Sequence, residues 1–194
     1  MCGRYYVDEE LWEDIRRVVG EVDDRLKGKG ARDVYPSQEA LVITGNSQGL
    51  QVDTMCWGFL GYDQKRLLIN ARSETALSRR TFRESVLHRR CVIPARHFYE
   101  WDSGKNKVTF QRQQASPLYM AGFYREMQGK DSFIILTTGA NASVKETHDR
   151  MPLVLEPEEL RPWITDEVYF EDILHKVPPE LEELREFEQQ KLPF

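Results

Sequence analysis

Short apolar segments follow one another along this chain with little sequence between most of them. They are rich in β-branched and aromatic residues and occupy 41–44, 67–70, 91–95, 107–111, 118–124 and 133–138. Segments of this kind are typical of β-strands. A parallel connection between neighbouring strands needs roughly a dozen residues or more, and most of these connections are shorter. We therefore predict an α+β fold built on a curved, mostly antiparallel, barrel-like sheet with flanking helices.

Helical patterns mark the segments that should flank this sheet. Residues 8–19 place apolar side chains at helical spacing, and Asp8 can cap the first turn. Shorter helices are predicted near 78–88, 141–147 and 157–164, and a last one at 179–190. A chain of 194 residues suits one domain with a sizeable core. We predict a single domain over 1–194, with an acidic C-terminal helical segment over about 156–194.

The net charge of −5 conceals an uneven distribution along the chain. Residues 156–194 hold 12 acidic and 4 basic side chains, a net charge of −8. Residues 65–96 hold 9 basic and 2 acidic side chains, a net charge of +7, and 8 of the 9 are arginine. The planar guanidinium matches phosphate oxygens. On charge alone, a solvated charged face is the simpler explanation of such a segment.

The cysteines and the hydropathy pattern narrow the cellular setting. Cys2, Cys56 and Cys91 are scattered, so neither a disulfide framework nor a zinc site is predicted. No apolar run approaches the roughly 20 residues that span a bilayer, and the start of the chain lacks a secretory pattern. We expect a cytoplasmic protein, nucleoid-associated if bacterial, with no membrane partner.

The second residue of the chain carries unusual chemical potential. Methionine ahead of a small residue is normally trimmed, which would leave Cys2 with a thiol and a free α-amine. An α-amine has a reference pKa of about 7.7–8.0, so a useful fraction is neutral at neutral pH. Together with the nucleophilic thiol it can condense with an aldehyde, first as an imine and then as a thiazolidine ring. The alternative is a small buried apolar side chain, as most free cysteines are.

A second candidate segment follows the apolar residues at 67–69. If the strand continues, Asn70 and Arg72 point to one face and Ala71 to the other. That face would then present an amide beside a guanidinium. The structural alternative is a strand-to-helix turn in which Ser73 caps the helix and Arg72 forms an ion pair.

Two further segments hold acid–base candidates. Period-two alternation puts Phe98 and Glu100 on one side of a strand, with Tyr99 and Trp101 on the other. Carboxylates enclosed by aromatic side chains resist ionisation, as an acid–base group needs, although Glu100 could equally pair with an arginine. His148 would share a face with the arginine two positions later in an extended segment. Histidine transfers protons well at neutral pH, but a lone histidine is more often structural.

In their order and content, these motifs resemble the SOS response-associated peptidase (SRAP) family, which includes abasic-site-processing proteins. The resemblance covers most of residues 1–165 and rests on Met1-Cys2-Gly3-Arg4-Tyr5, Trp57-Gly58-Phe59, Asn70-Ala71-Arg72-Ser73-Glu74-Thr75, Arg90-Cys91-Val92-Ile93-Pro94-Ala95, Phe98-Tyr99-Glu100-Trp101, Thr137-Thr138 and His148-Asp149-Arg150-Met151-Pro152. Two positions depart from the family pattern: His97 replaces the usual glycine, and Tyr35 stands where a small residue is common.

The resemblance implies a function on damaged DNA. Similar proteins bind single-stranded DNA at abasic sites and form a thiazolidine crosslink that shields the lesion. By matched position, the catalytic residues are Cys2, Asn70, Glu100 and His148, and the DNA-binding residues are Arg4, Trp57, Arg72, Trp101 and Arg150. The arginines would hold phosphates, and the tryptophans would support or stack on bases. No metal or organic cofactor is implied, and we expect a monomer.

Specific roles follow for the catalytic set in this interpretation. Cys2 is the nucleophile, and Asn70 orients the N-terminal residue or the sugar. Glu100 serves imine formation and ring closure, while His148 assists proton transfer at the sugar oxygen. The activity would be lyase-like. Two alternatives stay open: a cysteine-type peptidase, whose only substrate could be its own Met1, and a non-covalent single-strand-binding module in which Cys2 is incidental.

Overall fold

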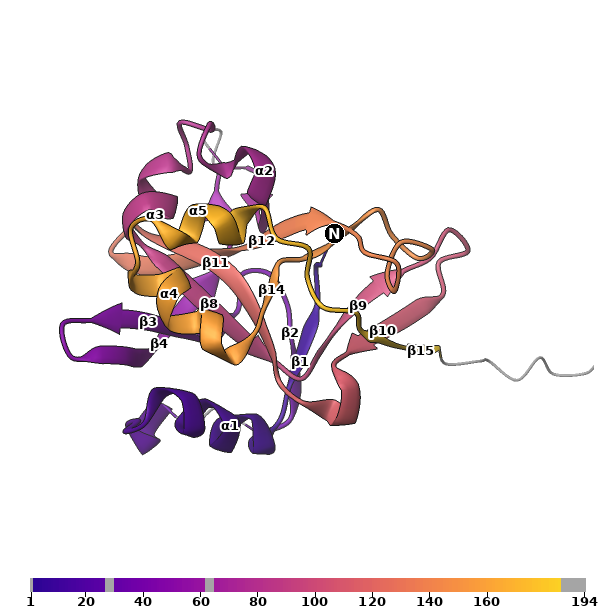
Figure 1. The fold of residues 1–194 in the computed structure, drawn as a ribbon, viewed down its shortest axis with the longest axis horizontal. Helices are drawn as coiled ribbons and strands as arrows, with labels where there is room; N and C mark the ends of the chain where they lie inside the picture. The colour runs from indigo at the N-terminus through magenta and orange to yellow at the C-terminus, as the bar shows by residue number, and fades with distance from the viewer. Residues whose placement is uncertain (1, 27–29, 62–64, 186–194) are drawn as a thin grey trace, which may run out of the picture.

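A computed structural model of the chain describes residues 2–26, 30–61 and 65–185. Among these residues, a ring of hydrogen-bonded strands forms the centre of the fold (Figure 1). The ring closes because β12 pairs with β4 on one side and with β11 on the other. Its members, in spatial order, are β12 (Lys130–Gly139), β4 (Gly49–Trp57), β3 (Glu39–Asn46), β8 (Arg90–Ala95) and β11 (Leu118–Met127).

Shorter strands extend this ring where the candidate motifs lie. The strand β7 runs parallel to β12, and β13 and β14 pair antiparallel with β12 and β11. A separate short pair is formed by β5 and β6. The bounds of these strands are Asn70–Arg72 for β7, Arg150–Pro152 for β13, Val154–Leu155 for β14, Phe59–Leu60 for β5 and Leu67–Leu68 for β6.

A second sheet is entirely antiparallel in the described residues and carries the amino terminus. Its spatial order is β15 (Glu182–Arg185), β10 (Lys107–Gln111), β9 (His97–Trp101), β1 (Tyr5–Val7) and β2 (Arg32–Val34). The predicted α+β class with a mostly antiparallel, barrel-like sheet is therefore confirmed. The parallel pairs, β12 with β4 and β12 with β7, join segments far apart in the sequence.

The helices lie outside the sheets (Figure 1). In Figure 1, α1 lies alone at the bottom of the view, whereas α2 to α5 gather on the opposite side. Their bounds are Glu9–Val19 for α1, Ser73–Ala76 for α2, Arg83–His88 for α3, Leu160–Thr165 for α4 and Tyr169–Leu174 for α5. Short 3₁₀ turns occur at Asp24–Leu26, Gln113–Ala115 and Pro157–Glu159. No helix within the described ranges is long and apolar enough to cross a membrane.

The start of α1 follows the predicted capping pattern. The Asp8 carboxylate accepts a hydrogen bond from the backbone N–H of Leu11 at 2.9 Å, which satisfies an otherwise unpaired donor of the first turn. Arg96 then binds the same carboxylate through two guanidinium nitrogens, each at 3.0 Å. This ion pair fastens the helix to the bend between β8 and β9 and gives Arg96 a structural role.

Alternation along the strands separates two apolar cores. On β8, Val92 packs with the helices, whereas Cys91 and Ile93 point to the opposite face. The core on that opposite face also contains Cys2 and Tyr5, both fully buried. The candidate reactive residue is thus anchored in the interior between the two sheets.

Two helix predictions are wrong. Residues 142–147 form successive turns that do not continue into a helix, although the backbone N–H of Lys145 donates to the carbonyl of Asn141 at 3.0 Å. The C-terminal helix predicted at 179–190 is replaced over Glu182–Arg185 by β15, which pairs with the edge of β10. An edge strand offers unpaired backbone groups, and β15 satisfies them. The remainder of that predicted helix, 186–190, lies outside the described residues, as does the end of the acidic segment.

Other elements begin or end away from their predicted positions. The helix predicted at 78–88 begins only at Arg83, after a turn. The helix α5 was not predicted, although Asp166 accepts from the backbone N–H groups of Val168 and Tyr169 in the manner of a capping residue. The strand β4 was missed because polar residues, among them Asp53, interrupt its apolar positions.

Candidate functional site at the amino terminus

Cys2 is held in a buried position by contacts from two directions. Its thiol lies 3.8 Å from the backbone carbonyl of Arg4, and its own carbonyl accepts a hydrogen bond from Asn70 Nδ2 at 2.8 Å. The strand β7, paired with the central strand β12, places Asn70 there. Asn70 and Cys2 are 68 positions apart in sequence. This contact supports the predicted role of Asn70 in orienting the N-terminal residue.

Glu100 lies on the interior face of β9, close to Cys2. Its side chain is buried, as are those of Phe98 before it and Val108 opposite it. Burial raises the pKa of the Cys2 thiol to about 12, and the negative charge of Glu100 adds to this shift. The thiol in this environment is protonated at neutral pH. Attack by sulfur therefore requires a nearby group that accepts its proton, and Glu100 is suitably placed.

His148 lies just before β13 and is oriented by the backbone. The N–H of Arg150 donates to His148 Nδ1 at 2.9 Å. We therefore assign the proton of a neutral imidazole to Nε2. Asp149 Oδ1 also lies 3.0 Å from Nδ1, a contact that would be favourable only if Nδ1 carried a proton. The two contacts cannot both be satisfied, and we favour the backbone bond because the Asp149 side chain is 84% exposed and can turn into water.

Arg150 connects His148 to the Asn70 strand. Its guanidinium binds both carboxylate oxygens of Glu74, at 2.6 and 2.9 Å, and also donates to the backbone carbonyl of Thr137. The hydrogen bond from Arg150 is the main cause that lowers the pKa of Glu74. This fork joins α2, β12 and β13. A phosphate that binds Arg150 must share this guanidinium with Glu74.

Arg4 also has a carboxylate partner, whereas Arg72 has none. Arg4 donates to Asp33 on β2. Arg72 is exposed at the end of β7 and, like Arg79, Arg80 and Arg83, pairs with no acidic side chain in the described part of the chain. These last three arginines belong to the predicted basic segment but were missed as individual site residues. Their exposure, which sequence alone did not reveal, makes them available to phosphates.

The two predicted tryptophans have opposite environments. Trp101 is 40% exposed at the end of β9, as a base-stacking residue requires. Trp57 is fully buried, donates from Nε1 to the Ile69 carbonyl at 3.0 Å and stacks on Phe133. The prediction that Trp57 stacks on bases is therefore wrong, because its ring faces are covered by protein. Its contact with Tyr5, at 5.1 Å between ring centroids, supports the site from within.

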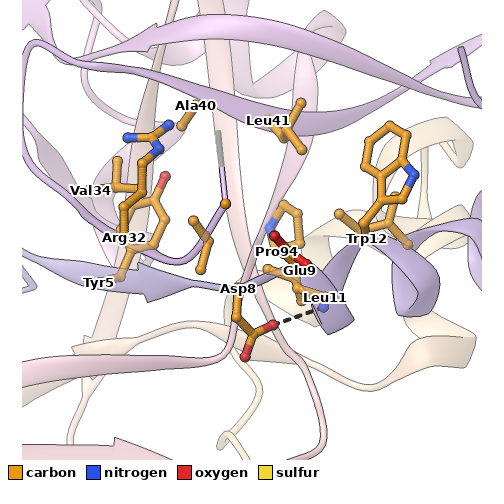
Figure 2. Close-up of a pocket in the computed structure, with 13 residues that line it drawn as sticks. Tyr5, Asp8, Glu9, Leu11, Trp12, Arg32, Val34, Ala40, Leu41 and Pro94 are labelled. Atoms are coloured by element: carbon orange, nitrogen blue, oxygen red, sulfur yellow. Dashed lines mark hydrogen bonds between the residues drawn. The ribbon is translucent and has the colours of Figure 1, made fainter. Parts of the chain in front are cut away.

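A small cavity lies away from these residues. It measures about 60 Å³ and is lined by α1 and by neighbouring strands. Figure 2 shows Leu11 and Trp12 of α1 on one side and Tyr5 on the other. None of the predicted catalytic residues lines it. In the described ranges, no group of three His, Cys, Asp or Glu side chains is arranged to hold a metal ion.

Comparison with known proteins decides the family. The sequence profile of the family described as "SOS response associated peptidase (SRAP)" matches residues 1–189. The chain belongs to this family. It is 31% identical over 183 residues to the abasic site processing protein YedK of Escherichia coli, covering 87% of this chain and 81% of YedK. It is 30% identical over 183 residues to the abasic site processing protein YoaM of Bacillus subtilis, covering 84% and 79%.

Solved structures with a similar fold match nearly the whole chain. A crystal structure of a protein from Bordetella bronchiseptica superimposes with a TM-score of 0.77 at 25% identity, covering 96% of this chain and 100% of that protein. A phage-related protein from the same organism gives a TM-score of 0.77 at 23% identity, covering 96% and 95%. The predicted family resemblance is thus confirmed by the sequence comparisons.

Proposed function

We propose that this SRAP chain binds single-stranded DNA at abasic sites and crosslinks to them through Cys2 after Met1 is removed. The observation that carries the proposal is the environment of Cys2: its carbonyl is held by Asn70 and its thiol lies in the field of the buried Glu100. The names of its curated relatives, abasic site processing proteins, point to the same class of substrate.

The chemistry balances without a cofactor. The α-amine of Cys2 attacks the aldehyde carbon of the ring-opened sugar and forms a carbinolamine. The carbinolamine loses water as its C–O bond breaks, and an imine results. The thiol then adds to the imine carbon: a C–S bond forms, and the sulfur proton ends on nitrogen. The product is a thiazolidine, and its mass is that of protein plus DNA minus one water.

Two residues are placed to move the protons in these steps. Glu100 can donate a proton when water leaves and accept one from the thiol when the ring closes. His148, with its proton assigned to Nε2, can donate to the sugar oxygen during ring opening. Asn70 keeps the N-terminal residue in a fixed orientation while both steps occur.

An aldehyde-bearing oligonucleotide tests this proposal directly. The protein is incubated with single-stranded DNA that carries one abasic site, then heated in detergent and analysed by gel and by intact mass. We expect a stable adduct, with the mass deficit of one water, for protein that begins at Cys2. Acetylation of the α-amine, or retention of Met1, should abolish it.

The same experiment separates the alternatives. An adduct formed at full yield by protein that retains Met1 contradicts the thiazolidine mechanism. Binding without any adduct identifies a non-covalent single-strand-binding module. Removal of Met1 by purified protein, with no adduct on the oligonucleotide, identifies a peptidase that acts on its own amino terminus.

Phosphate binding should depend on Arg72, two positions after Asn70, more than on the exposed Arg161 of α4. Arg72→Ala is expected to weaken binding to single-stranded DNA and to reduce the slope of log affinity against log salt by about 0.7, the value for one phosphate contact on single strands. Fluorescence anisotropy over a salt titration measures both quantities. Arg161→Ala, an exposed arginine of α4, is the control and should bind as wild type. Equal slopes for all three proteins would show that Arg72 contacts no phosphate.

A further inference from the structure

The outer face of the second sheet carries aromatic side chains that the mechanism does not use. Along β9, Phe98 and Glu100 point inward, so Tyr99 and Trp101 point to the opposite face. On the adjacent edge, Val34 ends β2 pointing inward, and Tyr35 follows it. The Tyr35 side chain is 41% exposed. We define the outer face by Arg4, Asp33, Tyr35, Tyr99, Trp101 and Lys107.

Arg4 is the centre of this outer face. Its guanidinium carbon lies 5.2 Å from the ring centroid of Tyr35 and 4.7 Å from that of Tyr99, so it is placed between two aromatic rings. Lys107 contributes a second cation, with its ammonium 5.3 Å from the Tyr99 ring. Asp33 binds Arg4 and offsets part of the positive charge. The outer face therefore combines exposed π surface with two cations.

The ring and hydroxyl of Tyr99 are held by a neighbouring histidine. His97 Nε2 lies 2.8 Å from the Tyr99 hydroxyl. The His97 ring stacks on Tyr6, with 4.7 Å between centroids and an interplanar angle of 3°.

Arg4 also links the outer face to the reactive residue. Its backbone carbonyl is the group that the Cys2 thiol approaches at 3.8 Å, and it accepts from the Tyr99 N–H at 3.1 Å. A lesion sugar joined to Cys2 would therefore place the adjoining nucleotide within reach of Arg4. Aromatic rings beside cations suit a nucleotide, because the base stacks on the ring while the phosphate meets the cation.

We propose that Tyr35 is a stacking residue for the base of the nucleotide next to the lesion, with Arg4 at the intervening phosphate. This inference rests on the proposed function and adds a contact that depends on the base rather than on the lesion. Tyr99, Asp33 and His97 act as positioning residues. Asp33 binds the Arg4 guanidinium, the Tyr99 ring lies against that guanidinium, and His97 contacts the Tyr99 hydroxyl.

A thermodynamic cycle between protein and DNA tests the contact. The ligand is a single-stranded oligonucleotide with a central tetrahydrofuran, a stable abasic analogue that has no aldehyde. Further oligonucleotides also lack the base on the 5′ or the 3′ side. Tyr35→Ala should weaken binding to the first oligonucleotide by about 5- to 150-fold, the range for loss of one stacked base. Removing the base that stacks on Tyr35 should weaken DNA binding by the wild-type protein to a similar extent. The same removal should change the affinity of Tyr35→Ala by less than about 2-fold.

Two control variants separate stacking from other causes. Tyr35→Phe keeps the ring and should bind like wild type, whereas Tyr169→Ala removes a tyrosine of α5 that is 42% exposed and should change nothing. The salt slope of Tyr35→Ala should equal that of wild type, because no charge is removed. If removal of the 5′ base and removal of the 3′ base each reduce the affinity of wild type and of Tyr35→Ala equally, the stacking proposal is overturned.

Failure of this inference can be distinguished from failure of the proposed function. Crosslinking of wild type to an aldehyde-bearing oligonucleotide is measured in parallel. Normal crosslinking without any coupling between Tyr35 and a base overturns the stacking contact alone. Absence of both crosslinking and binding overturns the proposed function and this inference with it.

Discussion

Glu100→Gln is expected to slow crosslink formation by about 10²–10⁴-fold, the usual cost of losing a general acid–base group. The amide keeps the shape of the side chain but can neither accept the thiol proton nor donate a proton to the departing water. Binding to the non-reactive tetrahydrofuran oligonucleotide should change little, because Glu100 is buried and contributes no positive charge. A gel time course of adduct formation measures the rate, and anisotropy measures the affinity.

Matched variants make this result specific to Glu100. Glu126→Gln removes an exposed carboxylate of β11 and should leave the rate unchanged. A thermal unfolding curve for Glu100→Gln establishes that the variant is folded. If folded Glu100→Gln crosslinks at the wild-type rate, Glu100 has no part in the proton transfers, and another group must remove the thiol proton.

Arg90→Met is expected to lower the free energy of unfolding by about 3–5 kcal/mol. The guanidinium of Arg90 is buried against the Phe170 ring at 4.3 Å and is bound entirely by backbone carbonyls. These carbonyls belong to Val86, Leu87, Trp163, Ile164 and Asp166. They lie at the ends of α3 and α4, where carbonyls lack helical partners. Methionine would fill similar space but leave these acceptors unpaired.

Urea unfolding measures this effect through the midpoint and slope of the transition. Arg161→Met, which replaces an exposed arginine of α4, is the control and should stay within about 0.5 kcal/mol of wild type. A loss below about 1 kcal/mol for Arg90→Met would mean that the carbonyls find other donors or water. Burial lowers the pKa of Arg90, but an arginine starts so high that it stays charged at neutral pH.

Local patterns predicted several elements well. Strand β10 occupies Lys107–Gln111, the predicted range, and its five residues alternate between half-buried and buried positions. The cap of α1 by Asp8 likewise depends only on residues three positions apart. The C-terminal strand β15 could not be predicted in this way. Its four residues become a strand because β10 offers them an unpaired edge. The paired residues are distant in sequence: Gln111 and Glu182 are 71 positions apart.

The environments of individual candidate site residues also depend on the tertiary structure and not on local sequence patterns. Trp57 and Trp101 are equivalent in the sequence motifs, yet one is enclosed by Tyr5 and Phe133 and the other is exposed. Arg72 and Arg150 both adjoin candidate catalytic residues, but only Arg150 is bound by Glu74, 76 positions away. Such pairs depend on how distant strands come together, and no local pattern encodes them.

The sequence by itself determined the family and the candidate reactive residue. The thiol of the second residue is a covalent property of the chain, and the motifs from Cys2 to Pro152 are specific in their order. Only the tertiary structure decided which side chains lie beside Cys2 and Arg4. Asn70 meets Cys2, and Arg4 lies between Tyr35 and Tyr99, because β1 pairs with β2 and β9 while β7 pairs with β12. These contacts follow from strand pairing across long sequence separations, where burial and backbone hydrogen bonding outweigh local preference.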